Sequence, residues 1–174
     1  MRKGLTMILM TVALGVDGSA FGHRARTAPG PSRSTASSYA KRTYIVVAGV
    51  GNVQFKLGTE KSVTANDGST ITAFSITNDY GGTADSAHAA VMFFRAAGFL
   101  GWASSRAAMF LTLEPSSGSA IRVSYPIWTA SDPTCCPSGT EVVSYGWNGS
   151  RIVASAQPPM IFGKPGTKLH LTPG

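Results

Sequence analysis

Short apolar runs separated by turn signals limit this chain to a β-rich fold. The clearest pair of runs is Glu141–Trp147 and Arg151–Ser155, which flank Asn148-Gly149, a dipeptide typical of β-hairpin turns. A second turn signal lies at Asn66–Ser69. The segment after it, Ile71–Ile76, alternates apolar and polar residues, as a half-buried strand does. The sequence therefore predicts hairpins rather than long helices.

Further strands are expected wherever an apolar, β-branched or aromatic run is bounded by turn residues. These segments are Tyr44–Ala48, Val53–Leu57, Ala90–Phe94, Phe99–Trp102, Met109–Leu113 and Ala120–Tyr125. The Ala-rich stretch from Ala87 to Leu113 is ambiguous, because short apolar runs do not distinguish a strand from a buried helix, and we interpret it as strands. The predicted fold class is mainly β: antiparallel hairpins that form a sandwich or a strongly bent sheet, with room for one short helix.

The first 20 residues have the plan of an export signal. Arg2 and Lys3 precede the apolar run Gly4–Val16, and the small residues Gly18–Ala20 follow it. No cysteine follows the run, so the pattern does not predict a lipid-anchored signal. The alternative is an uncleaved N-terminal anchor, through which alone the chain would contact a membrane.

Three further parts are expected after the signal. Residues 21–43 are rich in Arg, Pro, Gly, Ser, Thr and Ala and lack periodicity, which predicts a disordered linker. Residues 44–162 form the expected β-rich domain. Residues 163–174 are expected to be a loosely ordered C-terminal tail.

Most of the net charge of +7 lies outside the predicted domain. Residues 1–43 hold seven basic residues and one acidic residue, whereas residues 44–162 hold six basic and seven acidic residues. A nucleic-acid-binding domain is expected to carry its basic patch on the fold itself, so nucleic acid is not predicted as a partner. The signal predicts an extracytoplasmic location, either secreted or associated with the cell envelope.

Ser131–Gly139 is the chemically unusual stretch, because the two cysteines of the chain, Cys135 and Cys136, are adjacent and lie between two prolines. Thiols of exported proteins tend to be oxidised. However, neighbouring Cα atoms are about 3.8 Å apart, below the usual disulfide range of about 4.4–6.8 Å. Three states stay open: a vicinal disulfide, a reduced pair packed in a rigid turn, and a metal-binding or intermolecular role. The pair is the disulfide or redox candidate of the chain.

The sequence predicts no catalytic residue, cofactor or metal. Of the three histidines only His88 lies in the predicted domain, and no pair of residues has metal-ligand spacing. No Gly-x-Ser-x-Gly or phosphate-binding loop occurs. A hydrolase that pairs a serine with His88 is a minor alternative, and the question of enzymatic activity stays open with a non-enzymatic role favoured.

A binding patch is a further hypothesis for the surroundings of the cysteines. Trp128 and Asp132 precede the pair, and Tyr145 and Trp147 lie in the strand predicted after it. Aromatic residues are enriched in recognition surfaces. The core or a sheet face is the more ordinary place for such rings.

Three motifs resemble those of a known family: Tyr125–Trp128, Asp132–Gly139 and Val143–Gly149. With them the chain resembles the LppP/LprE lipoproteins of actinobacterial cell envelopes over roughly Asn78–Pro159, although the cysteine that carries their lipid is missing. The resemblance implies an exported, largely β domain without assigned catalytic residues.

The expected function is therefore that of a non-enzymatic binding or structural module in the envelope or outside the cell. Its partner would be an unknown envelope component or a small ligand. The alternative is a redox-responsive or soft-metal-responsive protein that uses Cys135 and Cys136.

Overall fold

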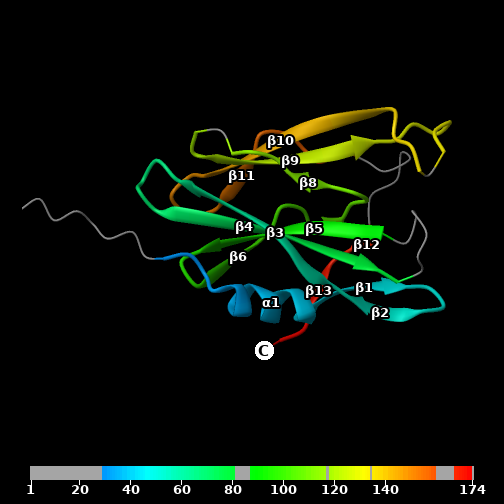
Figure 1. Ribbon diagram of the computed structural model, residues 1–174, viewed down its shortest axis with the longest axis horizontal. Helices are drawn as coiled ribbons and strands as arrows, with labels where there is room; N and C mark the ends of the chain where they lie inside the picture. The colour runs from blue at the N-terminus through cyan, green and yellow to red at the C-terminus, as the bar shows by residue number, and fades with distance from the viewer. Residues whose placement is uncertain (1–28, 81–86, 117, 134, 160–166, 174) are drawn as a thin grey trace, which may run out of the picture.

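The computed structural model describes residues 29–80, 87–116, 118–133, 135–159 and 167–173 (Figure 1). The predicted export signal and residues 21–28 of the predicted linker lie outside these ranges, as do residues 160–166. The described chain forms one helix, α1 (Arg33–Arg42), and the following strands. They are β1 (Thr43–Val47), β2 (Gly51–Gln54), β3 (Lys56–Thr64), β4 (Thr70–Asp79), β5 (Ala87–Arg95), β6 (Gly98–Trp102), β7 (Arg106–Ala107), β8 (Thr112–Leu113), β9 (Ala120–Ile127), β10 (Gly139–Trp147), β11 (Ile152–Ala154), β12 (Thr167–Lys168) and β13 (His170–Leu171).

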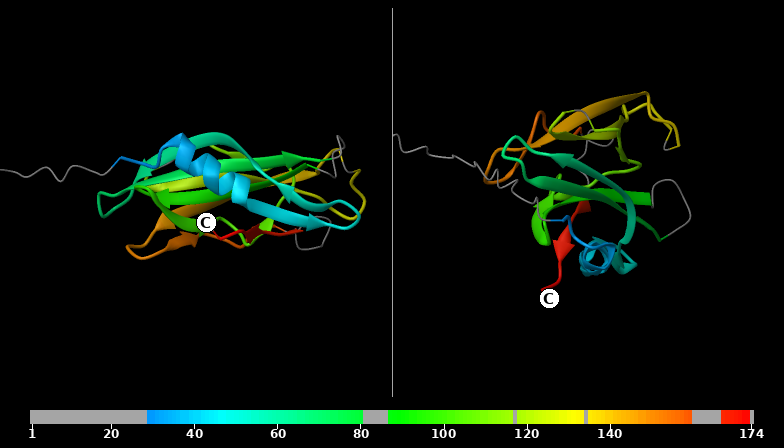
Figure 2. Two further views of the ribbon diagram at one scale, coloured as in Figure 1. Left: turned by 90° about the horizontal axis from the view of Figure 1, so that it is seen from below. Right: turned by 60° about the vertical axis from the view of Figure 1, so that its left-hand side comes forward.

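The strands and the helix stack in three layers (Figures 1 and 2). The middle layer is an antiparallel sheet with the strand order β3-β4-β5-β6. An outer antiparallel sheet, β11-β10-β9-β8, packs on one of its faces. The helix α1 and the sheet β13-β1-β2 cover the other face. The predicted fold class, mainly β with one short helix, is confirmed.

Strand β5 is apolar from Ala89 to Phe94 because both of its faces are buried there. The side chains that pack toward the outer sheet are Ala89, Val91 and Phe93. Those that pack toward α1 are Ala90, Met92 and Phe94. A strand buried on both faces loses the alternation of polar and apolar residues, which is why periodicity alone left this stretch ambiguous. The strands predicted at Ala90–Phe94 and Phe99–Trp102 are confirmed.

The two strongest turn signals form hairpins as predicted. In the turn between β3 and β4, Asp67 Oδ1 accepts a hydrogen bond from the backbone N–H of Ser69 at 2.9 Å, and Gly68 has a φ of +79°. In the turn between β10 and β11, Asn148 Oδ1 accepts from the backbone N–H of Ser150 and Arg151 at 3.0 and 2.9 Å. Side-chain oxygens that bind backbone amides a few residues ahead are the local reason why these sequences turn.

The prediction of a disordered linker is wrong for residues 33–42, which form α1. Ser32 Oγ caps the helix by accepting from the backbone N–H of Thr35 at 3.2 Å. Ala36 and Ala40 are fully buried against the middle sheet and the β1–β2 hairpin. The helix is stable because its two small residues fit closely against other elements. The segment has no long apolar stripe, so the sequence pattern did not predict a helix there.

The predicted tail is also ordered where the structure describes it. Strand β12 pairs with β7, and β13 pairs with β1, while Leu169 between them is buried in the core beneath α1. Long-range strand pairing holds this segment in place. The segment has no local turn signal or alternation from which its strands could be predicted.

Two strand predictions have wrong bounds. The predicted strand Val53–Leu57 is divided at the buried Phe55 between β2 and β3. The predicted strand Met109–Leu113 shrinks to Thr112–Leu113, because Phe110 has a φ of +49°, a left-handed conformation that interrupts a strand. No helix of the described residues is long and apolar enough to cross a membrane.

Candidate functional site

The loop between β9 and β10 carries the two cysteines, and it lies at one end of the outer sheet (Figure 1). The Sγ atoms of Cys135 and Cys136 are bonded to each other. Of the three states that the sequence left open, the structure has the vicinal disulfide. Both cysteines and the following Pro137 are exposed, so the disulfide is presented at the surface rather than packed in the core.

The carboxylate of Asp132 links the two ends of this loop by hydrogen bonds. Its Oδ2 accepts hydrogen bonds from the backbone N–H of Thr129 at 2.6 Å and of Ser138 at 3.2 Å. The hydrogen bond from Thr129 is the main reason why the pKa of the Asp132 carboxyl lies below its usual value. The backbone N–H of Cys136 also donates to the carbonyl of Pro133 at 3.0 Å. The carboxylate thus joins the residues before and after the cysteines, so it is part of the loop's frame.

The four residues of the predicted binding patch do not lie together. Trp128 is beside the loop, but the residue is only 3% exposed, and its ring lies 6.2 Å from the ring of Phe110, centroid to centroid. Tyr145 and Trp147 lie toward the far end of β10. At about 3.4 Å per residue, the eight steps along β10 from Gly139 to Trp147 span about 27 Å. The structure therefore joins only Trp128 and Asp132 to the cysteine loop.

Tyr145 is a core residue. It is 2% exposed, and its hydroxyl shares a hydrogen bond of 2.7 Å with that of Tyr125, on the neighbouring strand β9. Burial raises the pKa of Tyr145 to about 12 and that of Tyr125 well above its usual value. Both phenols stay protonated near neutral pH, and the pair belongs to the core between the two sheets.

Trp147 fastens the end of the outer sheet to the middle sheet. Its Nε1 donates to Asp67 Oδ2 at 2.9 Å, and the Arg95 guanidinium lies over its ring at 5.2 Å from the centroid. Arg95 also forms an ion pair of 3.6 Å with Asp67. Hydrogen bonds from Ser69, first from its hydroxyl and then from its backbone N–H, lower the pKa of Asp67. Trp147 therefore has structural partners within the chain, and its indole N–H is already used.

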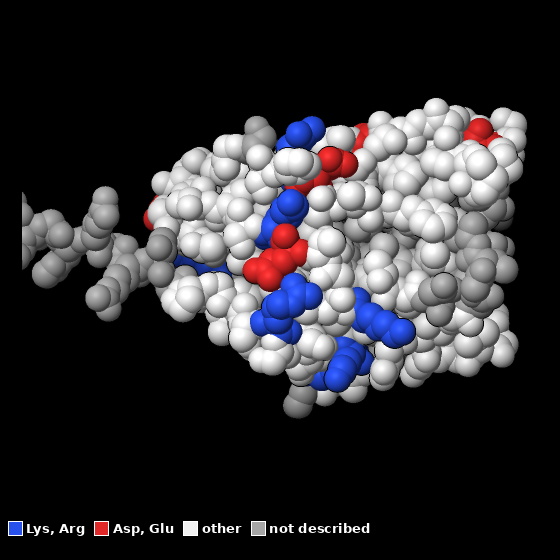
Figure 3. Space-filling model, viewed as in Figure 1, with Lys and Arg blue, Asp and Glu red and all other residues white. Residues whose placement is uncertain are grey.

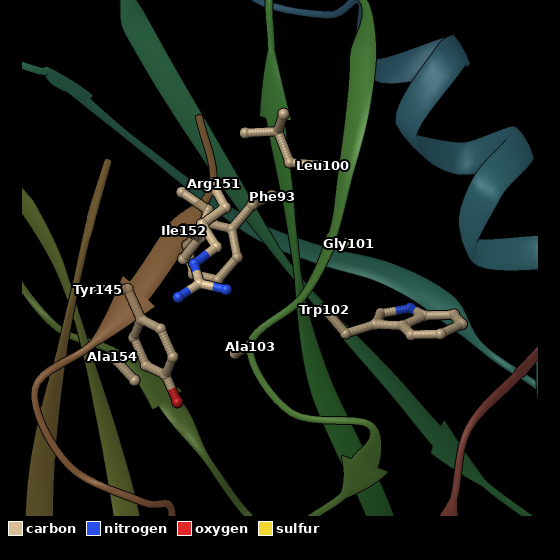
Figure 4. Close-up of a pocket in the computed structure, with 9 residues that line it drawn as sticks. All are labelled: Phe93, Leu100, Gly101, Trp102, Ala103, Tyr145, Arg151, Ile152 and Ala154. Carbon is tan, nitrogen blue, oxygen red and sulfur yellow. The ribbon is translucent and has the colours of Figure 1, made fainter. Parts of the chain in front are cut away.

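A cleft between β6 and β11 is the site that the sequence did not predict (Figure 4). These strands are the edges of the middle and outer sheets, and the cleft between them has a volume of about 170 Å³. Leu100, Ile152 and Arg151 line it, and the buried rings of Phe93 and Tyr145 lie beneath them. Nothing in the local sequence marks these residues, because they meet only when the two sheets pack together.

A second hollow, of about 330 Å³, lies at the start of β5. His88 contributes to it, its ring stacks on that of Tyr80 at 5.9 Å, and its Nε2 lies 3.2 Å from the hydroxyl of Thr167. Phe110 stands beside it and is 44% exposed. Among the described residues that line this hollow there is no serine or cysteine. The described part of the chain also contains no group of three or more His, Cys, Asp and Glu residues that could hold a metal ion.

These features define a small antiparallel β-domain whose most unusual surface element is an exposed disulfide loop. Residues 59–150 match the LppP/LprE lipoprotein family, and the chain belongs to that family. The match runs from β3 to the turn after β10 and includes the cysteine loop, so the resemblance seen in the three motifs is confirmed. The family is one of envelope lipoproteins, which is consistent in broad terms with an extracytoplasmic protein. No curated protein and no solved structure matches the chain.

Proposed function

We propose that this protein is a non-enzymatic binding module of the cell envelope or extracellular space that presents the Cys135–Cys136 loop to a partner as a rigid recognition edge. The observation that carries the proposal is the carboxylate of Asp132, which bridges the backbone on both sides of the exposed disulfide. A loop that is held in shape before binding loses less conformational entropy when a partner engages it. The exposed disulfide and prolines are then free to make contacts.

The distribution of charged side chains on the surface supports a partner that is recognised mainly by its shape. On the face shown in Figure 3, the charged side chains lie in one band across the layers, with basic and acidic groups alternating in its upper part and basic groups gathered at its lower end. The surface toward the cysteine-loop end of that face carries little charge. A binder of nucleic acid would be expected to show a continuous basic stripe, and this face supports a protein or other weakly charged envelope component instead.

The side chains whose pKa values are clearly shifted are not suited to acid–base chemistry near neutral pH. A general acid or base works best when its pKa lies near the working pH. The described groups with clear shifts move away from neutrality: the pKa values of Asp67 and Asp132 are lowered, and those of Tyr125 and Tyr145 are raised. All four are engaged in hydrogen bonds within the chain.

Photo-crosslinking in the intact cell tests the proposal. A photo-reactive amino acid at Pro137 is expected to capture a discrete envelope component. The same group at Val153, an exposed position on β11, serves as the matched control and is expected not to capture it. Replacing both cysteines, Cys135→Ala with Cys136→Ala, is expected to weaken the capture from Pro137. Equal capture from Pro137 and Val153, or capture that both alanines leave unchanged, contradicts the proposal.

A redox switch is the second candidate, and the exposed bond between the adjacent cysteines favours it. An external dithiol would supply both electrons. Its thiolate attacks one cysteine sulfur, which breaks the Cys135–Cys136 bond, releases the other cysteine as a thiol and leaves a mixed disulfide. The second donor thiol then attacks that mixed disulfide and releases the second protein thiol, as the donor itself becomes a disulfide. Alkylation followed by intact-mass measurement detects this change. A disulfide that a dithiol fails to open in the folded protein rules out the switch.

A further inference from the structure

We infer that the layer formed by α1, the sheet β13-β1-β2 and the adjoining strand β12 docks on an anionic membrane surface with the side that points away from the middle sheet. We call this side the docking face. The residues that carry the inference are Lys41, Tyr44, Val46, Val50, Lys168 and His170. The inference goes beyond the proposed function and does not rest on the cysteine loop, which belongs to the outer sheet on the other side of the middle sheet.

The docking face is an outer surface of the three-layered fold. In the left view of Figure 2, α1 and the β1–β2 hairpin lie in front of the middle sheet. Ile45 on β1 is fully buried in the core beneath α1. Because side chains alternate between the two faces of a strand, its neighbours Tyr44 and Val46 point away from that core. The outer side of β1 therefore presents these two side chains to whatever the layer meets.

The charge of this layer has one sign. Residues 18–59 hold six basic residues and no acidic one, and residues 142–174 hold three basic residues and no acidic one. The elements α1, β1, β2, β12 and β13 all come from these two stretches. In Figure 3, which has the view of Figure 1, basic groups gather at the lower end of the charged band, where α1 and the β1–β2 hairpin lie. Arg33 is not counted in the docking face, because it is paired with Glu60 of β3 at 3.4 Å. An anionic surface thus meets no opposing charge from the elements of this layer.

Two lysines provide the positive charge of the docking face. Lys41 lies in the last turn of α1 and is exposed, and Ser34 and Ser38 lie one and two turns before it on the same exposed side. Lys168 on β12 is exposed, and the next residue, Leu169, is buried in the core beneath α1, so alternation directs the lysine outward. Neither lysine belongs to an ion pair among the described residues. Each ammonium group near an anionic lipid surface raises the affinity by about fivefold.

Exposed apolar side chains on the β1–β2 hairpin distinguish a lipid surface from other anionic partners. Val46 is 54% exposed and Val50, in the turn, is 58% exposed. Tyr44 lies on the same side of β1, and its ring stacks on that of His170 at 5.1 Å. Binding to a membrane interface combines burial of apolar side chains with attraction to anionic lipids, and a tyrosine suits this boundary because its ring is apolar and its hydroxyl polar. A nucleic acid would use the lysines but would gain little from the valines.

The order of the chain also favours a membrane as the partner. The apolar run Gly4–Val16 precedes α1, with only residues 17–32 between them. A chain held in a membrane by that run would keep α1 close to the lipid, which raises the effective concentration of the docking face there. The proposed contact is made by the folded domain itself, in addition to any contact through the N-terminal run. It leaves the cysteine loop, on the opposite outer layer, available to another partner.

Fluorescence of the exported protein on lipid vesicles tests the inference. An environment-sensitive fluorescent amino acid at Val50 is expected to shift its emission to the blue when vesicles of equal parts phosphatidylglycerol and phosphatidylcholine are added. Vesicles of phosphatidylcholine alone are expected to cause a much smaller shift. The same amino acid at Val153, exposed on β11 of the outer sheet, is the matched control and is expected not to respond. The label reports only its own surroundings, so membrane contact through the N-terminal run alone would leave Val50 unchanged.

Charge variants measure the electrostatic part of the binding. Lys41→Gln and Lys168→Gln are each expected to weaken the affinity for the anionic vesicles by about fivefold, read from the titration at Val50. Arg151→Gln removes the same charge from the outer sheet and is expected to leave the affinity unchanged. All three side chains belong to exposed residues, so the variants are expected to fold, which circular dichroism checks.

Four results would overturn the inference: no emission shift at Val50, an equal shift at Val153, equal binding to the neutral vesicles, or lysine variants that bind like Arg151→Gln. A stronger response at Val50 to duplex DNA than to the anionic vesicles would identify a nucleic acid as the partner and overturn it as well. The measurements at Val50 and Val153 decide the question even if a charge variant fails to fold. None of these outcomes bears on the crosslinking test at Pro137.

Discussion

The buried tyrosine pair offers the sharpest test of the packing between the two sheets. Tyr125 and Tyr145 are each 2% exposed, and their hydroxyls are 2.7 Å apart. Tyr145→Phe removes one hydroxyl and leaves the other in the core without this partner. An unsatisfied buried hydroxyl costs about 1–3 kcal/mol, so we expect either single variant to lower the free energy of unfolding by about that amount.

The double variant, Tyr125→Phe with Tyr145→Phe, is expected to be less destabilised than the sum of the two single variants. Removing both hydroxyls leaves no unpaired polar group, and such double replacements are often nearly neutral. Urea denaturation of the four proteins measures the coupling as a double-mutant cycle. Costs that add without a coupling term would refute the view that the two hydroxyls stabilise the core as a pair.

The same pair predicts loss of stability at high pH. An unfolded tyrosine loses its proton near pH 10, whereas the raised pKa of folded Tyr145 is about 12. Between these values the unfolded state binds fewer protons, so the free energy of unfolding falls as pH rises, by up to about 1.4 kcal/mol per pH unit for each such tyrosine. The double variant should lose this part of the slope. An unchanged slope in urea denaturation between pH 10 and 12 would refute the assignment.

Two further predictions concern α1 and the cysteine loop. Ala40→Leu should lower the free energy of unfolding by about 1–3 kcal/mol in urea denaturation, because Ala40 is fully buried and a larger side chain overpacks the site. The control is Lys41→Leu, on the exposed side of the helix. If Ala40→Leu were as harmless as the control, α1 would not pack on the sheet. Asp132→Asn should speed amide hydrogen exchange at Thr129, which loses a charged acceptor. Since the pKa of Asp132 is lowered, the slow exchange of the unchanged protein should persist as the pH falls to about 4, the ordinary pKa of aspartate, and be lost only below that pH. Exchange that is equally slow in the variant would mean that Asp132 does not hold the loop.

Local chemistry explains what was predictable from the sequence alone. The turns at Asp67 and Asn148 depend on side chains that bind amides two or three residues ahead, so the residues that make each turn lie within it. The strands next to these turns follow from alternation or from short apolar runs. The unusual loop was visible because Cys135 and Cys136 are neighbours, and its likeness to the LppP/LprE family was visible in the same residues. Whether the two sulfurs are bonded was open, because it depends on the geometry of the loop.

Tertiary structure alone decided the remaining features, since each depends on residues distant in the chain. The helix α1 is ordered because Ala36 and Ala40 fit against strands that come later. Trp147 links the outer sheet to the middle sheet because its indole N–H donates to Asp67, 80 positions earlier in the chain. The cleft at Arg151 exists only where the edges of two sheets approach each other. Turn formation is encoded within a few residues, whereas burial and the meeting of side chains across sheets are properties of the whole packed chain.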